Sequence, residues 1–165
     1  MKLEGLKINF LGDSITEGYL AGGKDKVYHA VLAKQAKLAV ARNYGISATK
    51  YAFQSGYPEC PKTEADAQSF CEGFTKMDDD ADVVIVFGGT NDYGHGDAPI
   101  GGFSDRDYNT LYGACHYLYS GLIKKYLGKP IIIMTPLHRV GELKKYRFCE
   151  NMGVWNIEGL CKYNP

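Results

Sequence analysis

Short apolar runs alternate along the chain with longer stretches in which apolar residues recur at helical spacing. Four of these runs predict β-strands, at residues 7–11, 38–42, 82–87 and 130–134. Strands that alternate with helices are typical of a parallel sheet covered by helices on both faces. The pattern therefore predicts an α/β fold.

Three helices are expected between the strands. The first begins near Asp25, the second opens at Thr63 with Asp66 completing a capping box, and the third follows Ser104 and ends near Gly128. We interpret their apolar stripes as helix faces packed on a core, not as a cofactor site. The stripes consist of Val27, Ala30, Val31 and Leu38 in the first helix, of Ala67, Phe70, Cys71, Phe74 and Met77 in the second, and of Tyr108, Leu111, Tyr112, Cys115, Leu118, Tyr119, Leu122 and Ile123 in the third.

Composition supports one globular domain over residues 1–165. Hydrophobic residues make up 45% of the chain and the formal net charge is zero, which suits a sizeable core. The chain has no repeat, low-complexity segment or linker at which to divide it. No basic run or stripe favours nucleic acid or an anionic membrane, so the expected partner is a small or neutral molecule.

The start of the chain and its cysteines indicate the expected location of the protein and the state of its thiols. The first seven residues lack the apolar core of a signal peptide, and no apolar run could span a bilayer, so we expect a cytoplasmic protein. The five cysteines lie far apart, without the paired spacing of a zinc site. We therefore expect reduced, structural thiols and no metal.

Polar residues follow each predicted strand. The segments are Gly12-Asp13-Ser14, residues 43–47, residues 88–92 and residues 135–139. Ligands of open parallel sheets bind at the carboxyl ends of the strands, where such loops converge. A hydroxyl, a glycine amide and an asparagine side chain supply one nucleophile and several donors for the oxyanion of an acyl-transfer intermediate. The predicted chemistry is ester hydrolysis.

Three of these segments resemble motifs of the GDSL-type, or SGNH, hydrolases: "GDSITEG" at 12–18, "RNYGIS" at 42–47 and "GGTND" at 88–92. The resemblance implies that Ser14 is the nucleophile and that the Gly45 amide and the Asn91 side chain bind the oxyanion. It also implies a flavodoxin-like three-layer α/β/α fold with a parallel sheet of four or five strands, shortened at its C-terminal end. The family needs no cofactor, and its substrates range from acetylated sugars to lipids.

The chain departs from the family's last motif, an Asp-x-x-His in which the histidine is the general base. It has no aspartate beyond Asp107. A short basic helix is expected at 142–152 and a fifth, edge strand in "VWNI" at 154–157. A truncated chain, a reading-frame change that produced the tail, and a base from an unexpected position all remain open.

Four histidines could replace the missing base or contact substrate. His138 follows the fourth strand and is the best substitute, whereas His95 is expected to line the pocket. Together with Asp13, which can also cap the following helix, they are the candidate substrate-binding residues. His29 and His116 lie within helical patterns and are expected to be packed or surface residues.

Two other functions compete with ester hydrolysis. "GYLAGGKD" at 18–25 resembles a phosphate-binding loop, but Asp25 replaces its Ser or Thr and the match begins several residues beyond the strand. The stronger rival is an impaired or truncated member of the family that binds an acyl or carbohydrate ligand without turnover. A shortened sheet would also leave an edge exposed, which predicts a homodimer or low solubility.

Overall fold

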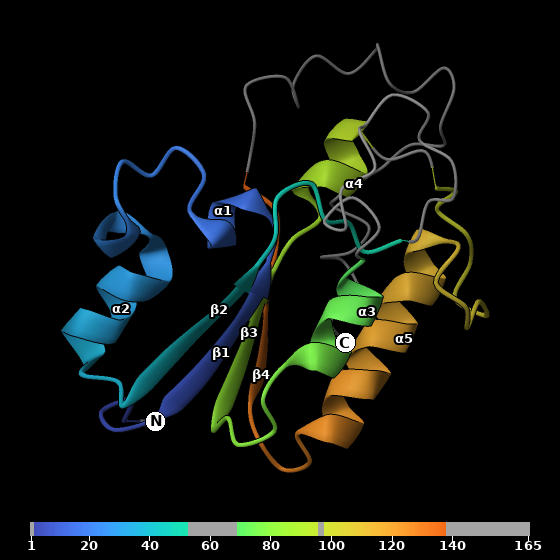
Figure 1. Ribbon diagram of the computed structural model, residues 1–165. Coiled ribbons are helices and arrows are strands. Elements are labelled where there is room, and N and C mark those ends of the chain that lie inside the picture. The colour runs from blue at the N-terminus through green and yellow to red at the C-terminus, as the bar shows by residue number, and fades with distance from the viewer. Residues whose placement is uncertain (1, 53–68, 96–97, 138–165) are drawn as a thin grey trace.

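Four parallel strands form the central layer of the structure, a computed structural model that describes residues 2–52, 69–95 and 98–137 (Figure 1). The strands lie in the order β2-β1-β3-β4. They are β1 (Lys7–Gly12), β2 (Val40–Gly45), β3 (Val83–Phe87) and β4 (Ile131–Met134). All three neighbouring pairs are parallel, which confirms the predicted sheet.

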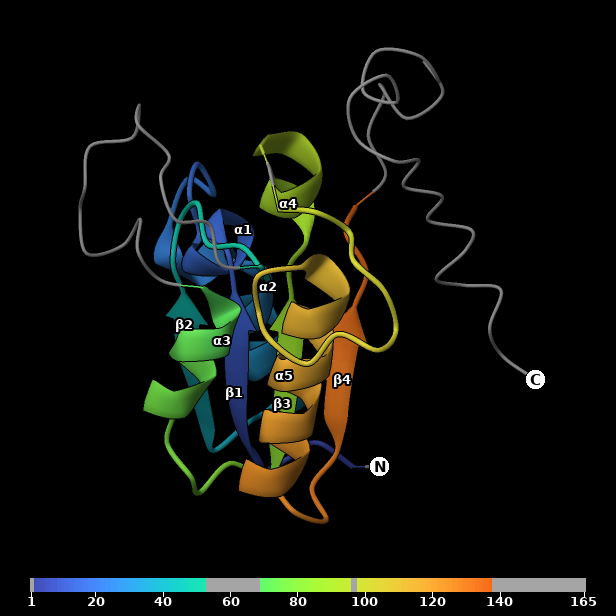
Figure 2. The same cartoon turned by 90° about the vertical axis from the view of Figure 1, so that its right-hand side faces the viewer.

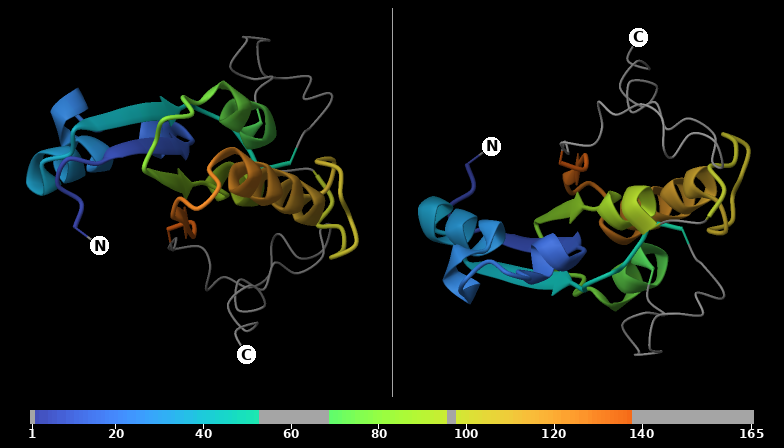
Figure 3. Two further views of the ribbon diagram at one scale, coloured as in Figure 1. Left: turned by 90° about the horizontal axis from the view of Figure 1, so that it is seen from below. Right: turned by 90° about the horizontal axis from the view of Figure 1, so that it is seen from above.

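Helices cover both faces of the sheet and its carboxyl edge. In the views along the strands, α2 lies on one face, and α3 and α5 lie on the other (Figure 3). The short helices α1 and α4 lie beyond the carboxyl ends of the strands (Figure 2). The helices are α1 (Ser14–Glu17), α2 (Tyr28–Ala36), α3 (Phe70–Gly73), α4 (Thr90–His95) and α5 (Leu111–Lys125), with 3-10 turns η1 (Lys24–Lys26) and η2 (Phe74–Lys76). This is the predicted α/β/α arrangement, and no helix of the described residues could cross a membrane.

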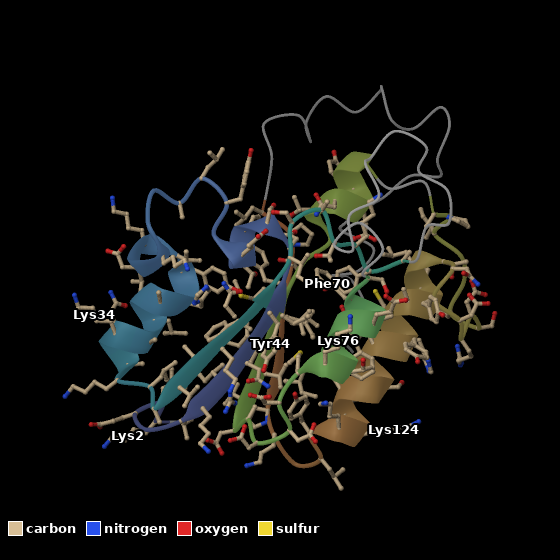
Figure 4. The ribbon with its side chains drawn as sticks, viewed as in Figure 1. Lys2, Lys34, Tyr44, Phe70, Lys76 and Lys124 are labelled. Carbon is tan, nitrogen blue, oxygen red and sulfur yellow. The ribbon has the colours of Figure 1, made fainter. Side chains whose placement is uncertain are left out.

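The core has two parts, one on each face of the sheet. All five side chains of β3 are buried, because this central strand is covered on both sides. Val84 and Val86 pack against α3 and α5, together with Phe70 and Leu118. Figure 4 shows Phe70 between α3 and the sheet, whereas Lys34 and Lys124 point outward from α2 and α5.

Most of the predicted elements are confirmed, with shifted boundaries. Strand β2 begins at Val40, and α5 begins at Leu111, seven residues after Ser104. The predicted stripe of α2 was partly wrong: Val31 is 38% exposed, while Tyr28 and Leu32 face the core. Thr63 and the elements expected at 142–152 and 154–157 lie outside the described residues.

The described part of the stripe predicted for the second helix is confirmed as core, although its residues belong to α3, to η2 and to the position after η2. Phe70, Cys71, Phe74 and Met77 are all buried, between 1% and 7% exposed. Burial in apolar surroundings raises the pKa of the Cys71 thiol to about 12, so this thiol is protonated and unreactive near neutral pH. That agrees with the structural role expected for the cysteines.

The strand order creates one switch point. From β1 the chain crosses to β2 on one side, and β3 pairs with the other side of β1. Connections on opposite faces leave a crevice at the carboxyl ends of the two strands where the direction changes. Gly12, the last residue of β1, is paired with Gly45 and with Phe87. The segments that follow all three strands therefore start at the same level, next to one another.

Candidate active site

Strand β1 passes into α1 without an intervening turn because Asp13 caps the helix. Its Oδ1 accepts a hydrogen bond from the Ile15 amide at 2.9 Å, which satisfies one of the free amides at a helix start. A Cβ at Gly12 would overlap the hydroxyl of Thr16, so the helix can begin this close only after a glycine. Ser14 is consequently the first residue of α1, half-buried at the end of the strand.

Asp13 itself is 1% exposed. Its burial and its bond to Ile15 identify it as the cap of α1, which was the alternative to substrate binding expected from the sequence. A direct contact with substrate would require the carboxylate to leave this position. The sequence-based prediction that Asp13 binds substrate therefore gains no support from its geometry.

The loop after β2 lies directly on α1. A Cβ at Gly45 would overlap the backbone of Thr16 and Glu17, so only glycine allows this approach. The Ile46 amide donates to the Gly12 carbonyl at 3.1 Å, which continues the pairing of β1 and β2 by one bond. The Gly45 amide donates to Oδ1 of Asn43 at 2.8 Å. This amide would have to exchange that bond to hold an oxyanion.

Another amide of the loop has no such bond to exchange among the described residues. Ala48 has a left-handed backbone, with φ of 65°, which costs a residue with a Cβ about 1–2 kcal/mol. The neighbouring amides of Ser47 and Thr49 donate to Glu17 and Ile46. The Ala48 amide makes no hydrogen bond to a described residue. The sequence did not point to Ala48, because an alanine gives no signal of a left-handed conformation.

Residues after β3 clamp the same loop. Nδ2 of Asn91 donates to the Thr49 carbonyl at 2.9 Å, and an amide side chain has a second N–H for another acceptor. The carboxylate of Asp92 accepts from the amides of Tyr51, at 3.0 Å, and Ala52, at 3.2 Å. Burial raises the pKa of Asp92, although these amides oppose the shift. Asn91 and Asp92 thus hold the loop at two neighbouring points.

Gly88 and Gly89 make the turn from β3 into α4. A Cβ at Gly88 would overlap the ring of Phe70, and Gly89 has φ of 96°. Larger residues would push α4, and with it Asn91, away from the loop after β2. The structure therefore brings together the segments that contain Ser14, Gly45 and Asn91, as their places after the strands predicted.

The histidines divide into two groups. His29 is 8% exposed and its Nε2 lies 3.1 Å from the Thr16 carbonyl, and burial lowers its pKa. His116 is exposed on α5. These positions match the packed and surface roles predicted for them. His138 and the side chain of His95 lie outside what the structure describes, so their predicted roles stay predictions.

In the described part of the chain, no group of three His, Cys, Asp or Glu side chains could hold a metal ion. The glycine-rich segment at 18–25 does not form a strand-to-helix phosphate loop, because α1 intervenes and η1 follows. The described site is thus a parallel α/β switch point that presents a serine and several hydrogen-bond donors.

Comparison with known proteins identifies the family. The model of the GDSL-like lipase/acylhydrolase family matches residues 10–151, so the chain belongs to this family of ester hydrolases. Ser14 and the loops after β2 and β3 all lie within the matched range. No curated protein matches the sequence.

Solved structures have the same fold. A protein from Lactobacillus plantarum is 32% identical, with a TM-score of 0.66 over 82% of this chain and 58% of its own. A GDSL-like lipase from Bacteroides ovatus is 21% identical, with a TM-score of 0.62 over 86% and 77%. A carbohydrate acetylesterase family member from Sinorhizobium meliloti is 18% identical, with a TM-score of 0.51 over 89% and 71%. The chain thus spans under two thirds of the Lactobacillus protein.

Proposed function

We propose that this chain hydrolyses carboxylic esters of small molecules, including acetylated sugars, with Ser14 as the nucleophile. The observation that carries the proposal is the common level of three strand ends, where Gly12 is paired with both Gly45 and Phe87. This register supports a grouping of the serine, the loop amides and Asn91 around one crevice. Membership of the acylhydrolase family supports the reaction class.

The reaction begins when Oγ of Ser14 attacks the acyl carbon and its proton passes to a general base. The negative charge that develops on the acyl oxygen is stabilised by hydrogen bonds from N–H donors. The proposed donors are the amide of Ser14, the side chain of Asn91, and a loop amide, that of Gly45 or Ala48. Collapse of the intermediate breaks the ester bond, the alcohol leaves with a proton, and water then releases the acid from the serine. The Ala48 amide would act without giving up a bond to a described residue, whereas the Gly45 amide would first have to leave Asn43.

His138 is the proposed base. It follows β4 in the sequence by only four residues, and the carboxyl end of β4 lies at the same edge of the sheet as that of β1. His29 is unsuited to the role, because its ring nitrogen is bonded to the Thr16 carbonyl and its pKa is lowered. A neutral imidazole within reach of Ser14 is what removal of the hydroxyl proton requires.

Acetylated carbohydrates are the proposed substrates for two reasons. The Sinorhizobium protein with this fold is a member of a carbohydrate acetylesterase family. In this chain Tyr19, two residues after α1, is 69% exposed, and an exposed tyrosine ring can stack on a sugar. No acidic or basic surface is needed for such a neutral ligand.

The test is hydrolysis of p-nitrophenyl acetate between pH 5 and 10 by the full chain. Ser14→Ala should lower the rate by about a thousandfold or more, whereas the matched control Ser104→Ala, in an exposed loop, should not change it. His138→Ala should cause a comparable loss and His116→Ala none. Equal rates for the wild type and Ser14→Ala would contradict the proposal.

A second candidate function is ligand binding without turnover. It is favoured by the positions of His29 and His116, the two described histidine side chains, neither of which serves Ser14. The loop donors alone would still bind an acyl or sugar ligand. Background rates in wild-type protein, combined with a rise in melting temperature on addition of acetylated xylose, would support binding over catalysis.

A further inference from the structure

Glu17, the last residue of α1, makes contacts that the proposed reaction does not use. Its Oε2 accepts a hydrogen bond from the Ser47 amide at 2.7 Å and another from the Ser47 hydroxyl. A carboxylate that accepts two donors from one residue fixes that residue more firmly than a neutral acceptor does. In the described part of the chain Glu17 has no ion pair with Lys or Arg. Its bonds are made to the loop after β2.

Asn43 makes a second link between α1 and this loop. Its Nδ2 lies 3.4 Å from the Glu17 carbonyl, and its Oδ1 accepts from the Gly45 amide at 2.8 Å. The close approach of Gly45 to the Glu17 backbone adds a steric contact at the same place. The carboxylate of Glu17 therefore binds the loop, while its carbonyl and backbone nitrogen lie against Asn43 and Gly45.

These links matter because of where Ser14 and Ala48 lie. Ser14 is three residues before Glu17 in the same helix, and the Glu17 amide is itself bonded to the Asp13 carbonyl at 2.9 Å. Ala48 follows Ser47 directly, so its amide belongs to the peptide plane that starts at the Ser47 carbonyl. Fixing Ser47 at both its amide and its hydroxyl fixes the start of that plane. Glu17 and Ser47 thus link the helix that contains the serine to the residue before the Ala48 amide.

We propose that Glu17 is a positioning residue, which sets the place of the loop amides relative to Ser14 by holding Ser47. This inference rests on the proposed ester hydrolysis. Oxyanion donors act only when they lie within a few tenths of an ångström of the developing charge. A loop released from Glu17 keeps its anchors at Asn91 and Asp92 and the bond from the Ile46 amide to the Gly12 carbonyl, but Ser47 loses both of its bonds to Glu17.

The experiment compares Glu17→Ala, Glu17→Gln and the matched control Glu4→Ala, an exposed glutamate away from the loop. Amide hydrogen exchange of Ser47 and Ala48 is followed by NMR. In parallel, kcat and KM for p-nitrophenyl acetate and the melting temperature are measured. Glu17→Ala should speed exchange of Ser47 and lower kcat about tenfold with KM within about twofold, since one charge-assisted bond is lost.

Glu17→Gln should recover part of both effects, because its amide oxygen still accepts from Ser47, and Glu4→Ala should change neither. Unchanged exchange in Glu17→Ala would overturn the proposal. So would a fall of kcat that only parallels the melting temperature. Wild-type protein without turnover would refute the proposed function instead, and the exchange rates would still decide whether Glu17 holds the loop.

Discussion

At the scale of single residues, backbone conformation departs most from what residue type suggests. Leu20, Lys37 and Ala48 have φ between 52° and 65°, a region that glycine enters without cost. Ala48 is the instructive case, because its strained backbone lies beside the proposed oxyanion donors. Strain of this kind persists where neighbouring contacts hold the backbone, here those of Ser47 and Thr49.

Lys37 gives a prediction about stability. It ends α2 in a left-handed conformation, with φ of 52°, and its amide donates to the Ala33 carbonyl. Lys37→Gly should raise the free energy of unfolding by up to about 1 kcal/mol, because the Cβ that clashes in this conformation is removed. Urea denaturation measures the change.

The control is the same substitution inside the helix. Lys34→Gly, on the exposed side of α2, should lower the free energy of unfolding by about 1 kcal/mol, as glycine does in a helix interior. Equal destabilisation by both substitutions would show that the left-handed backbone of Lys37 carries no strain.

At the scale of elements, α5 shows how a boundary is decided by side-chain hydrogen bonds. Ser104 was the expected start, and the helix begins after Thr110 instead. The Thr110 hydroxyl accepts from the Gly113 amide at 3.1 Å and donates to Asp105 at 2.8 Å. As the N-cap, Thr110 with two hydrogen-bond partners is more favourable than Ser104 without such a bond. These partners come together only in the folded loop before α5, so the sequence alone did not reveal them.

The cap can be tested directly. Thr110→Ala should lower the free energy of unfolding by about 1–2 kcal/mol, because it leaves the Gly113 amide and the Asp105 carboxylate each without this partner. Thr110→Ser retains the hydroxyl and should cost much less. Thermal unfolding followed by circular dichroism compares the three proteins, and equal melting temperatures for Ala and Thr would contradict the assignment.

At the scale of the whole molecule, the ends of the sheet differ in chemistry. The proposed site lies at the carboxyl ends of the strands. Near the amino end of β3, Arg42 is paired with Asp78 and Asp80, each at 2.8 Å, and Lys7 is paired with Asp80. Ion pairs between exposed side chains are screened by solvent. They nevertheless make stability depend on pH.

The aspartates with shifted pKa values make opposite contributions to the pH dependence of stability. Hydrogen bonds from Lys7 and Arg42 lower the pKa of Asp80, and a bond from the Lys7 amide lowers that of Asp82, below the ordinary value of 3.8. Their contribution is present above this value and is lost as the pH falls through the lowered pKa. Burial raises the pKa of Asp92, so its contribution is present below 3.8 and is lost as the pH rises through the raised pKa.

Two variants separate these opposite effects in urea denaturation between pH 2 and 8. Asp80→Asn should weaken the fall of stability below about pH 4. Asp92→Asn should remove part of the decline that begins as the pH rises above 3.8. Unchanged pH profiles in both variants would contradict the assigned pKa shifts.

The β4 edge of the described sheet predicts self-association. In β4, Ile132 is 42% and Ile133 39% exposed, and this strand is the last of the described sheet. Exposed apolar edge strands pair with one another. Ile132→Lys should therefore lower the fraction of dimer in sedimentation velocity. Ile123→Lys, at an exposed position of α5, is the control, and an equal effect of both, or a wild type that stays monomeric, would contradict edge pairing.

The sequence by itself determined the class of fold and the three segments of the candidate site. A continuous apolar run such as that of β3 indicates a strand buried on both faces. Residues that follow parallel strands meet at the carboxyl edge of the sheet. The segments that contain Ser14, Gly45 and Asn91 could therefore be assigned to one edge from the order of strands and polar segments, whereas the choice of these three residues came from the resemblance to the GDSL-type hydrolases.

Only the tertiary structure decided which groups are free to act there. The Gly45 amide is bonded to Asn43, the Ala48 amide has no described acceptor, and Glu17 holds Ser47. These contacts join residues 2 to 30 positions apart through the register of β1 and β2. Hydrogen-bond partners and left-handed backbone follow from that register and from packing, which local sequence patterns do not encode.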